Sequence, residues 1–350
     1  MTDTRLLGEE LRRLLGDRSP EARVREVMET EDGIDEECWA RLGALGFLGM
    51  AIPERYGGGG QGHAETAVLG VELGRSLACV PYLSTIVLGA GALLAAGDEE
   101  ARARHLPAIA AGRCRATLAL PDLVDEAAPP TVTAGDRVLD GRVDAVLDGH
   151  TADLLLVVAR DRAGGEGLWA VASNADGLRR RRLHTLDRTR RLARLDLRGV
   201  AARRIGDARA LGDVRRHAAV YLAAEQVGGA ERMLETAVAY AKVRTQFGRP
   251  IGGFQAVKHM CADMLVAVES ARAAALHAAA VPGDPVAASL AKAVCSEAYA
   301  AVATDAIQVL GGIGFTWEHP AHLYLRRARS IELMFGDPAY HYALLAEAAA

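Results

Sequence analysis

The segment Tyr240-Ala-Lys-Val-Arg-Thr-Gln-Phe-Gly-Arg-Pro-Ile251 is the strongest local signal in this sequence, because it joins two long apolar patterns. Before it, small and apolar residues recur at alternating spacings of three and four, which predicts a helix with a narrow apolar stripe. The stripe residues are Val220, Ala223, Val227, Ala230, Leu234, Ala237 and Ala241. Gly248 and Pro250 break the pattern and predict a turn. The segment therefore closes one helix, and a second helical pattern follows it.

Helical patterns dominate both ends of the chain. The run Gly57–Gly60 interrupts the first third. It has neither the Gly-Lys-Ser/Thr of a P-loop nor a preceding strand, so we predict a flexible loop rather than a phosphate-binding loop. The predicted helices are Leu6–Leu15, Cys38–Phe47, Ala64–Leu77, Leu83–Ala96, Glu99–Ala111, Phe254–Ala280 and Pro285–Leu310.

The middle of the chain has a different pattern, in which short segments rich in valine and leucine lie between Gly, Asp and Pro. These predicted strands are Arg115–Leu120, Arg137–Leu139, Arg142–Leu147, Leu154–Ala159 and Leu168–Ala172. Arg179–Arg198 is rich in arginine, but it lacks interleaved aromatic residues and contains Asp187 and Asp196. We therefore predict a solvated strand face there and not a nucleic-acid-binding patch.

The order of these patterns is helices, a small sheet and then helices, which is typical of an α+β fold that is mostly helical. The close spacing of the strands indicates a small antiparallel sheet or a barrel. We divide the chain into an N-terminal helical domain at residues 1–112, a middle β domain at 113–207 and a C-terminal helical domain at 208–350.

The composition is that of an ordinary soluble protein, with 350 residues, 50% hydrophobic, 25% charged and a net charge of −4. This balance indicates neither a nucleic-acid partner nor a membrane partner. The five cysteines are scattered and form no C-x-x-C motif, so we expect reduced thiols and no metal site. We find no signal-like segment and no long uncharged apolar run, and therefore expect a cytoplasmic protein without a membrane span.

A second motif, Gln308-Val-Leu-Gly-Gly-Ile-Gly-Phe315, ends a predicted helix with three glycines. Because glycine has no Cβ atom, backbone amides there can approach an anion or a flat ring. Arg244 of the first segment could supply a planar guanidinium group for a phosphate. The residues alone leave plainer alternatives open, in which Arg244 is a solvated arginine at a helix end and the glycines are a helix C-cap.

Together the two segments resemble the hallmarks of the acyl-CoA dehydrogenase family, arginine-x-x-phenylalanine-glycine and glutamine-x-x-glycine-glycine-x-glycine-phenylalanine. Four further segments match in the same order: Leu42–Gly58, Glu72–Leu77, His105–Pro107 and Phe315–Ala328. The last is similar to a version common among actinobacterial proteins that degrade steroids and lipids. The resemblance covers roughly residues 20 to 345, and the shared order of spaced motifs makes it specific.

The resemblance implies a helical N-terminal domain, a middle β-barrel and a C-terminal four-helix bundle. It also implies bound FAD. Arg244 and Phe247 would contact its pyrophosphate and adenine side across a subunit interface, and Gln308, Gly311 and Gly312 would lie near the same cofactor. The implied assembly is a homotetramer, a dimer, or a mixed tetramer with a paralogous subunit.

The reaction of the family is the α,β-dehydrogenation of an acyl thioester, carried on CoA or on an acyl-carrier protein. A carboxylate removes the α-proton, and hydrogen bonds to the thioester oxygen stabilise the charge that develops there. The resemblance to the actinobacterial branch implies a bulky or steroid-type acyl chain as one candidate substrate. An electron-transfer flavoprotein is one candidate electron acceptor, and oxygen is the other.

This sequence departs from the family at the catalytic base. Extension without gaps from Gly311 places Phe335, within Met334-Phe335-Gly336-Asp337, where the family has its glutamate. Some relatives carry the base on the stripe helix, and that position falls near Ala218. Two segments that usually line the flavin with polar residues correspond to Leu118–Asp122 and Ala145–Leu147, and most of that polar lining is absent.

Two carboxylates are candidates for a relocated base. Glu225 lies on the stripe helix two turns after Ala218, although it also fits a carboxylate on a helix face. Asp337 neighbours the lost position, although it also fits a turn residue before Pro338. Other titratable residues nearby fit surface or packing roles better; they are Glu332, His322 and His341.

Three functions remain from the sequence. The chain is an FAD-dependent acyl-CoA dehydrogenase with a relocated base, or it is an inactive partner subunit of a mixed assembly. A third hypothesis is a scaffold that has lost the flavin, which the missing flavin lining favours. The scaffold hypothesis is disfavoured by three residues of the cofactor motifs, Arg244, Phe247 and Gln308.

Overall fold

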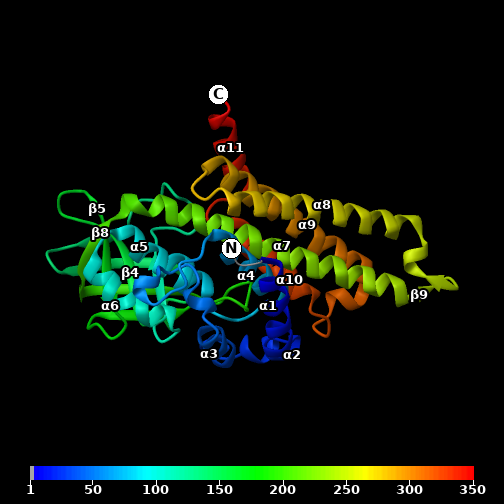
Figure 1. Cartoon of the computed structure of the whole chain (residues 1–350), viewed down its shortest axis with the longest axis horizontal. Coiled ribbons are helices and arrows are strands. Elements are labelled where there is room, and N and C mark those ends of the chain that lie inside the picture. Colours follow the sequence, from blue (N-terminus) through cyan, green and yellow to red (C-terminus); the bar gives the residue numbers. More distant parts are fainter. Residues whose placement is uncertain (1–3) are drawn as a thin grey trace. The chain divides into compact units, whose positions relative to one another are not determined.

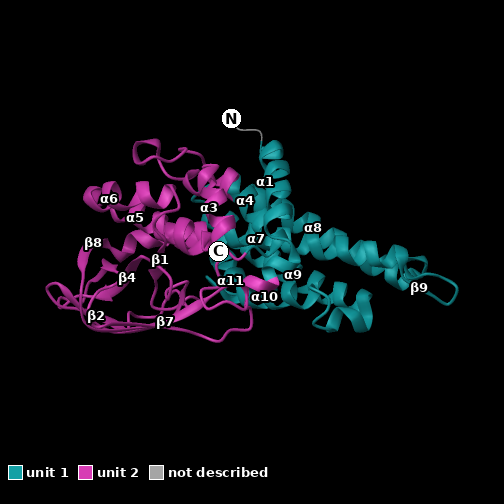
Figure 2. Ribbon diagram, turned by 90° about the horizontal axis from the view of Figure 1, so that it is seen from below, with its two compact units in different colours: residues 1–24, 67–78, 219–350 teal, residues 25–66, 79–218 magenta. Residues whose placement is uncertain are grey.

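The computed structural model describes residues 4–350, and the chain divides into two compact units (Figure 2). Unit 1 contains the residues up to 24, residues 67–78 and residues 219–350, and unit 2 contains residues 25–66 and 79–218. Unit 1 is helical, and unit 2 holds the sheet. This mostly helical fold with a sheet in the middle confirms the predicted α+β class.

Unit 1 is formed mainly by the C-terminal helices (Figure 1). Its helices are α1 (Thr4–Arg18), α8 (Gln255–Ala280), α9 (Pro285–Leu310), α10 (Ala321–Leu333) and α11 (Pro338–Ala348), with most of α4 (His63–Ser76) and α7 (Leu211–Val243). Asp284 starts α9 as its N-cap, because its carboxylate accepts hydrogen bonds from the amides of Val286 and Ala287. Helices α8 and α9 pack against each other as an antiparallel pair.

The predicted stripe on α7 is confirmed, because all of its residues except Leu234 are buried. Small side chains let the neighbouring helices approach closely. At Gly228, an added Cβ atom would overlap the backbone of Val71 on α4. The core around the stripe consists mainly of alanine, including Ala223, Ala224, Ala275 and Ala291.

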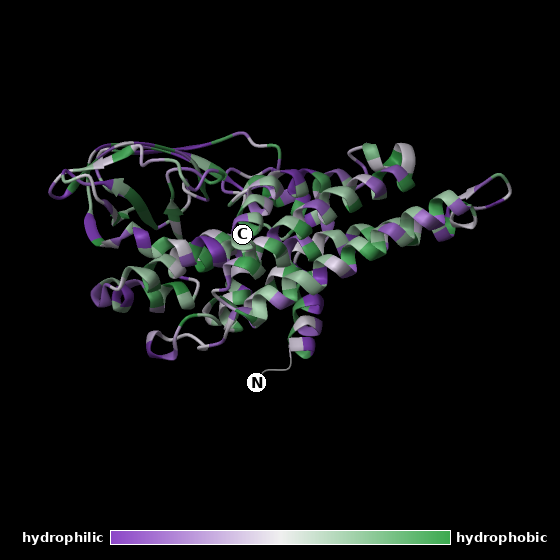
Figure 3. Cartoon of the chain, turned by 90° about the horizontal axis from the view of Figure 1, so that it is seen from above, coloured by the Kyte–Doolittle hydropathy of each residue, from purple (hydrophilic) through white to green (hydrophobic). Residues whose placement is uncertain are grey.

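Helix α9 with its final turn, Pro285–Phe315, is long and apolar enough to span a membrane by length and composition, with a mean hydropathy of 1.3. However, 72% of its most apolar window is buried inside the protein. Figure 3 shows apolar residues throughout these helices, with polar residues interspersed on them. Burial of this kind is typical of the core helix of a soluble protein.

The sheet of unit 2 has eight strands in the order β6-β7-β3-β2-β4-β5-β8, and β1 pairs with β4 outside this path. The strands are β1 (Ala116–Ala119), β2 (Val132–Ala134), β3 (Val138–Leu147), β4 (Leu154–Arg160), β5 (Glu166–Ala172), β6 (Leu178–Arg182), β7 (Leu192–Ala201) and β8 (Arg203–Asp207). β4 and β5 are antiparallel, with Leu154 opposite Ala172. Within the described chain, β6 and β8 end the path without pairing to each other.

The predicted strands all form, with two differences. The predicted strands Arg137–Leu139 and Arg142–Leu147 merge into the single strand β3, which begins at Val138, because Gly141 continues the strand with a positive φ of 142° and a register shift. The arginine-rich segment forms β6 and β7, as the predicted strand face requires. Strands β2 and β8 are short, and we did not predict them from the sequence.

The other helices of unit 2 are shorter. They are α3 (Glu36–Ala44), the π-helix η3 (Leu83–Ala90), α5 (Gly91–Ala96), α6 (Glu99–Ala110), the 3-10 turns η1 (Phe47–Gly49), η2 (Glu54–Tyr56) and η4 (Ala208–Ala210), and α2 (Glu21–Val27) at the unit boundary. The strands begin at Ala116 and end at Asp207, inside the predicted middle domain. The N-terminal helices are divided between the two compact units, and neither unit ends at residue 112. The domain boundary at residue 112 therefore stays a prediction.

Candidate functional site

A short hairpin joins α7 to α8 at one end of unit 1, where Figure 1 draws it beside the label β9. It consists of β9 (Thr245–Gln246), β10 (Arg249–Pro250) and the turn η5 (Ile251–Gly253). At its tip, Phe247 has a positive φ of 50° and is 92% exposed. The ring of Phe247 lies edge-on to Phe254 at 6.1 Å, and the guanidinium of Arg249 lies 4.1 Å from the centre of the Phe254 ring. The hairpin therefore presents an aromatic and cationic tip to its surroundings.

Arg244 lies at the base of this hairpin and is exposed. Its backbone is fixed, because its carbonyl accepts a hydrogen bond of 2.8 Å from the amide of Ile251. Among residues 4–350, no carboxylate lies within ion-pair distance of the Arg244 guanidinium. Its donors thus remain available for an external anion.

The end of α9 is the second predicted cofactor segment. Gln308, Gly311 and Gly312 are all exposed, and η6 (Gly311–Phe315) turns the chain toward α10. Gly311 adopts φ 65° and ψ −143°, a backbone conformation that essentially requires glycine. Gly312 differs, because its φ is not positive and an added Cβ atom would meet open space. Packing inside the described chain therefore gives no reason for glycine at 312, whereas close approach of an external group does.

These two segments lie at the same end of unit 1. Helix α8 begins at the hairpin and returns, and α9 packs antiparallel to it, so α9 ends where α8 began. Large apolar side chains are exposed there as well, since Phe315 is 85% exposed and Trp317 is 53% exposed. The structure thus brings the five predicted cofactor residues to one end of the helical unit, with their side chains or open glycine faces exposed.

The loop Met334–Asp337 links α10 to α11 and carries the residue at the predicted base position. Phe335 is buried and has a positive φ of 57°, which is a genuine outlier for a bulky side chain. Two buried titratable side chains hold the loop. His341 Nε2 lies 2.9 Å from the Phe335 carbonyl, and Lys292 Nζ donates to the Gly336 carbonyl at 3.0 Å. The strained conformation is therefore held in place by specific contacts.

The two candidate bases have structural contacts of their own. Glu225 on α7 is buried and forms an ion pair with Arg327 on α10, which is buried too. Asp337 is the N-cap of α11, because its carboxylate accepts a hydrogen bond of 2.8 Å from the amide of Tyr340. Ala218, the alternative position on the stripe helix, is fully buried.

The comparison with known proteins identifies the family. A family model described as "Acyl-CoA dehydrogenase, N-terminal domain" matches residues 2–113, and one described as "Acyl-CoA dehydrogenase, C-terminal domain" matches residues 214–350. The acyl-CoA dehydrogenase IpdE2 of Mycolicibacterium smegmatis is 38% identical over 321 residues, which cover 91% of this chain and 90% of that protein. The chain belongs to the acyl-CoA dehydrogenase family.

Other relatives of this acyl-CoA dehydrogenase family chain support the same family assignment. IpdE2 of Mycobacterium tuberculosis is 36% identical, with 96% of this chain and 94% of that protein covered. The solved Tcur3481-Tcur3483 steroid ACAD is 34% identical with a TM-score of 0.88, covering 99% of each chain. The ChsE4-ChsE5 complex from Mycobacterium tuberculosis is 30% identical with a TM-score of 0.91, covering 100% of this chain and 97% of that one.

Members of the acyl-CoA dehydrogenase family are FAD-binding flavoproteins. The residues at the hairpin and at the end of α9 fit such a group on local geometry. Arg244 has free donors for a phosphate, Phe247 offers an exposed ring, and Gly312 has open space above its Cα atom. These features would be unusual if the segments served only to pack the chain.

Sequence reasoning missed three residues that shape the loop and the core of this acyl-CoA dehydrogenase family fold. Lys292 was read only as part of a helical pattern, His341 as a surface or packing residue, and Arg327 as part of the family motif. All three are buried and hold polar partners. A lysine inside an apolar helical pattern was the one available signal, because a buried amine needs acceptors.

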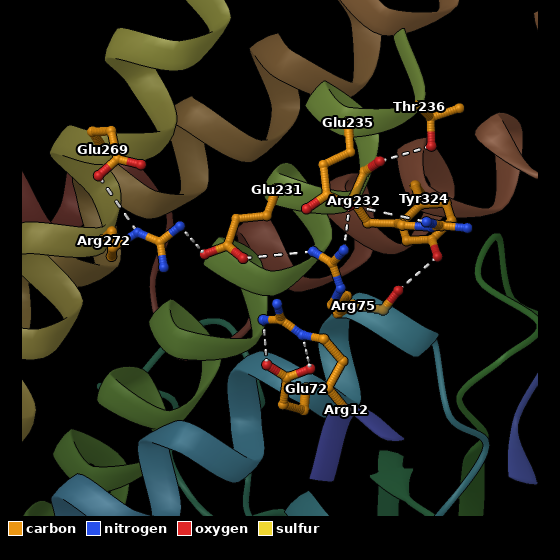
Figure 4. A network of polar contacts seen from close by, with 10 residues as sticks. All are labelled: Arg12, Glu72, Arg75, Glu231, Arg232, Glu235, Thr236, Glu269, Arg272 and Tyr324. Carbon is orange, nitrogen blue, oxygen red and sulfur yellow. Dashed lines mark hydrogen bonds and ion pairs between the residues drawn. The ribbon is translucent and has the colours of Figure 1, made fainter. Parts of the chain in front are cut away.

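A cavity of about 650 Å³ lies in unit 1 between α1, α4, α7 and α10. Figure 4 shows the ion pairs in and behind its wall, which alternate in sign. Arg12 pairs with Glu72 at 2.7 Å, and Glu231 pairs with Arg272 at 2.7 Å and with Arg75 at 3.6 Å. Because each buried carboxylate has an arginine partner, the wall offers little net charge to an anionic ligand. None of the predicted FAD residues lines this cavity, so it is not our candidate cofactor site.

Proposed function

We propose that this chain is an FAD-binding subunit of a mixed acyl-CoA dehydrogenase, in which a paralogous subunit supplies the catalytic base. The observation that carries the proposal is Phe335, which lies at the predicted base position, in a loop with a strained conformation that specific contacts hold in place. The side chain of Phe335 cannot accept a proton. Backbone strain of this kind is typical of functional sites.

Bound FAD would supply the hydride acceptor of the α,β-dehydrogenation. Arg244 would hold the pyrophosphate through charge-assisted hydrogen bonds, and Phe247 would cover the adenine side. Gln308 and Gly311 with Gly312 would lie along the same cofactor. The exposure of all five supports the idea that the FAD is shared across a subunit interface.

A relocated base within this chain is the weaker alternative. Glu225 forms a buried ion pair with Arg327, and its use as a base would break that pair. The carboxylate of Asp337 already accepts the N-cap hydrogen bond of α11 from the amide of Tyr340. We therefore place the base on the partner subunit.

The substrate class that we propose is a bulky acyl thioester of the steroid type. The support comes from the relatives, since one similar structure is named a steroid ACAD and another is a complex of two named proteins. CoA is the carrier that the family name supports, and an electron-transfer flavoprotein remains our proposed electron acceptor. We also propose a cytoplasmic location.

Replacement of Arg244 by alanine is expected to weaken FAD binding about ten- to one-hundredfold. The reason is that the loss of hydrogen bonds to a charged group costs about 1.5–3 kcal/mol. Flavin absorbance per protein after purification and the FAD dissociation constant would measure the effect. Arg244→Lys keeps the charge but not the planar fork, so an intermediate loss is expected.

Arg137→Ala, which removes an exposed arginine between β2 and β3, is the matched control and should keep its flavin. Equal flavin content in Arg244→Ala and Arg137→Ala would show that Arg244 does not bind FAD. A colourless wild-type assembly would instead favour the scaffold without flavin.

The chain is also expected to form a mixed oligomer. Co-expression with a glutamate-bearing paralogue should give one stable complex in light scattering, with a mass above that of the 37.0 kDa chain. The exposed Phe247 and Phe315 provide apolar surface for such an interface. A 37.0 kDa species that persists at working concentration with the paralogue present would contradict the shared cofactor site.

A further inference from the structure

The hairpin that joins α7 to α8 carries a concentrated positive charge (Figure 1). Residues 236–262 contain no Asp or Glu, although the whole chain has a net charge of −4. The same stretch contains four exposed cationic side chains, which are Lys242, Arg244, Arg249 and Lys258. Only three of the 41 basic residues of the chain are lysines, and two of these three flank the hairpin. This end of unit 1 therefore attracts anions.

Arg249 lies on the same face of the hairpin as Arg244. Arg249 is paired with Gln246 across the two strands, and the amide of Ile251 donates to the Arg244 carbonyl. Side chains alternate between the two faces of paired strands, so residues 244, 246, 249 and 251 share one face. Arg244 and Arg249 are diagonal neighbours in this pattern, roughly 7–8 Å apart and within reach of each other's long side chains. Two guanidinium groups can thus converge on one ligand.

The guanidinium of Arg249 is held in place by an aromatic ring and not by a carboxylate. It lies 4.1 Å from the centre of the Phe254 ring, and the edge of Phe247 meets the same ring at 6.1 Å. Within residues 4–350, no carboxylate pairs with Arg249. Contact with a ring uses the flat face of the guanidinium, whereas its N–H groups point outward in its plane. Arg249 is therefore ordered but keeps its donors for an external acceptor.

We infer that Arg249 is a second phosphate-binding arginine, which forms with Arg244 a clamp for the diphosphate of an adenosine diphosphate group. Two arginines suit this group, because each of its two phosphates is negatively charged and accepts charge-assisted hydrogen bonds. The exposed ring of Phe247 at the tip of the hairpin provides a flat surface for the adenine. The inference rests on the proposed function and deepens it, since it adds a residue to the proposed FAD site.

Two molecules of the proposed reaction contain an adenosine diphosphate group, namely FAD and the CoA of the substrate. The clamp fits the shared diphosphate of both. The other residues of the proposed FAD site, Gln308, Gly311 and Gly312, lie at the same end of unit 1 and favour FAD as the source. Separate measurements with FAD and with free CoA distinguish the two.

The test uses Arg249→Met in the intact chain, purified with its partner subunit. After removal of the flavin, titration with FAD monitored by flavin fluorescence should show binding about tenfold weaker than in the wild type, because a hydrogen-bonded charge is lost. The FAD dissociation constant should also depend less on salt concentration, since one ionic contact is missing. Affinity for free CoA, measured by isothermal titration calorimetry, should stay unchanged. Arg249→Lys keeps the charge but not the planar fork, so it should show an intermediate loss.

Matched variants separate a phosphate contact from general charge and from hairpin order. Lys242→Met removes one charge from the same end of unit 1 but outside the hairpin, and it should weaken FAD binding less than about twofold. Phe254→Leu keeps both arginines but removes the ring beneath Arg249, so an intermediate loss is expected. Because the hairpin is exposed, all variants should keep the circular dichroism spectrum and melting temperature of the wild type.

The outcomes are distinct for the clamp and for the proposed function. Wild-type affinity of Arg249→Met for both FAD and CoA would overturn the clamp, and so would an equal loss in Lys242→Met. Weaker binding of CoA alone would support the clamp with CoA as its ligand. If Arg244→Ala loses flavin while Arg249→Met keeps full affinity for both ligands, only the present inference fails. A wild type that binds no FAD contradicts the proposed function, and the CoA titration alone then decides the clamp.

Discussion

The isolated chain, purified with its flavin, is expected to oxidise acyl thioesters about 10²- to 10⁴-fold more slowly than the same chain assembled with a glutamate-bearing paralogue. This is the contribution that a positioned base typically makes to proton transfer. Phe335 offers no proton acceptor, and water in a closed apolar site is a poor substitute. Turnover with a steroid-type acyl-CoA, measured through reduction of an artificial electron acceptor, would check the difference.

The decisive control is an assembly in which the glutamate of the paralogue is replaced by glutamine. It should keep its mass and flavin content and fall to the rate of the isolated chain. If the isolated chain works at full rate with a simple straight-chain acyl-CoA, the placement of Phe335 at the base position is wrong. If activity of the isolated chain disappears in Glu225→Gln or Asp337→Asn while flavin stays bound, the hypothesis of a relocated base within this chain is correct.

The second large effect concerns stability. Glu225→Gln and Arg327→Met are each expected to lower the free energy of unfolding by about 3–5 kcal/mol, because each leaves one buried charge without its partner. The side chains of this pair are only 2% and 3% exposed, so water cannot compensate for the loss. Urea unfolding monitored by circular dichroism would measure both values.

The double variant Glu225→Leu/Arg327→Met is expected to lie within about 1 kcal/mol of the wild type, since apolar replacements of a buried pair are often neutral. The exposed pair Arg5 and Glu9 gives the matched control, and Glu9→Gln should cost less than about 1 kcal/mol. Additive losses in the double variant would mean that the two charges do not act as a pair. Such a result would reopen Glu225 as a candidate base.

The helices and most of the strands could be predicted from the sequence because they depend on local patterns. The apolar stripe from Val220 to Ala241 forms one face of α7, and the short apolar segments of the middle region form β1, β4 and β5. The predicted single helix Leu83–Ala96 was less accurate, since its first part is the π-helix η3. Its hydrogen-bond pattern depends on the packing around it, which no local pattern encodes.

The candidate site could be predicted only where it consists of short motifs. Arg244 and the glycines Gly311 and Gly312 stand within recognisable segments, and the structure places them at one end of the unit. The partners of Glu225 and Lys292 could not be predicted, because Arg327 and the Gly336 carbonyl lie far along the chain. Contacts of this kind exist only after the helices have packed, and the ion pair with Arg327 makes Glu225 part of the packed core.

The scarcity of lysine has a practical consequence for work on this protein. Lys242 and Lys258 are the exposed side-chain amines, and both flank the hairpin that presents Arg244 and Phe247. Reagents that couple to amines, such as those used for biotinylation, cross-linking or attachment to a sensor chip, would therefore modify side chains mainly at this hairpin. A preparation tethered in that way would have its proposed cofactor and partner surface blocked. Coupling through an affinity tag at the C-terminal end of α11 would leave the hairpin accessible.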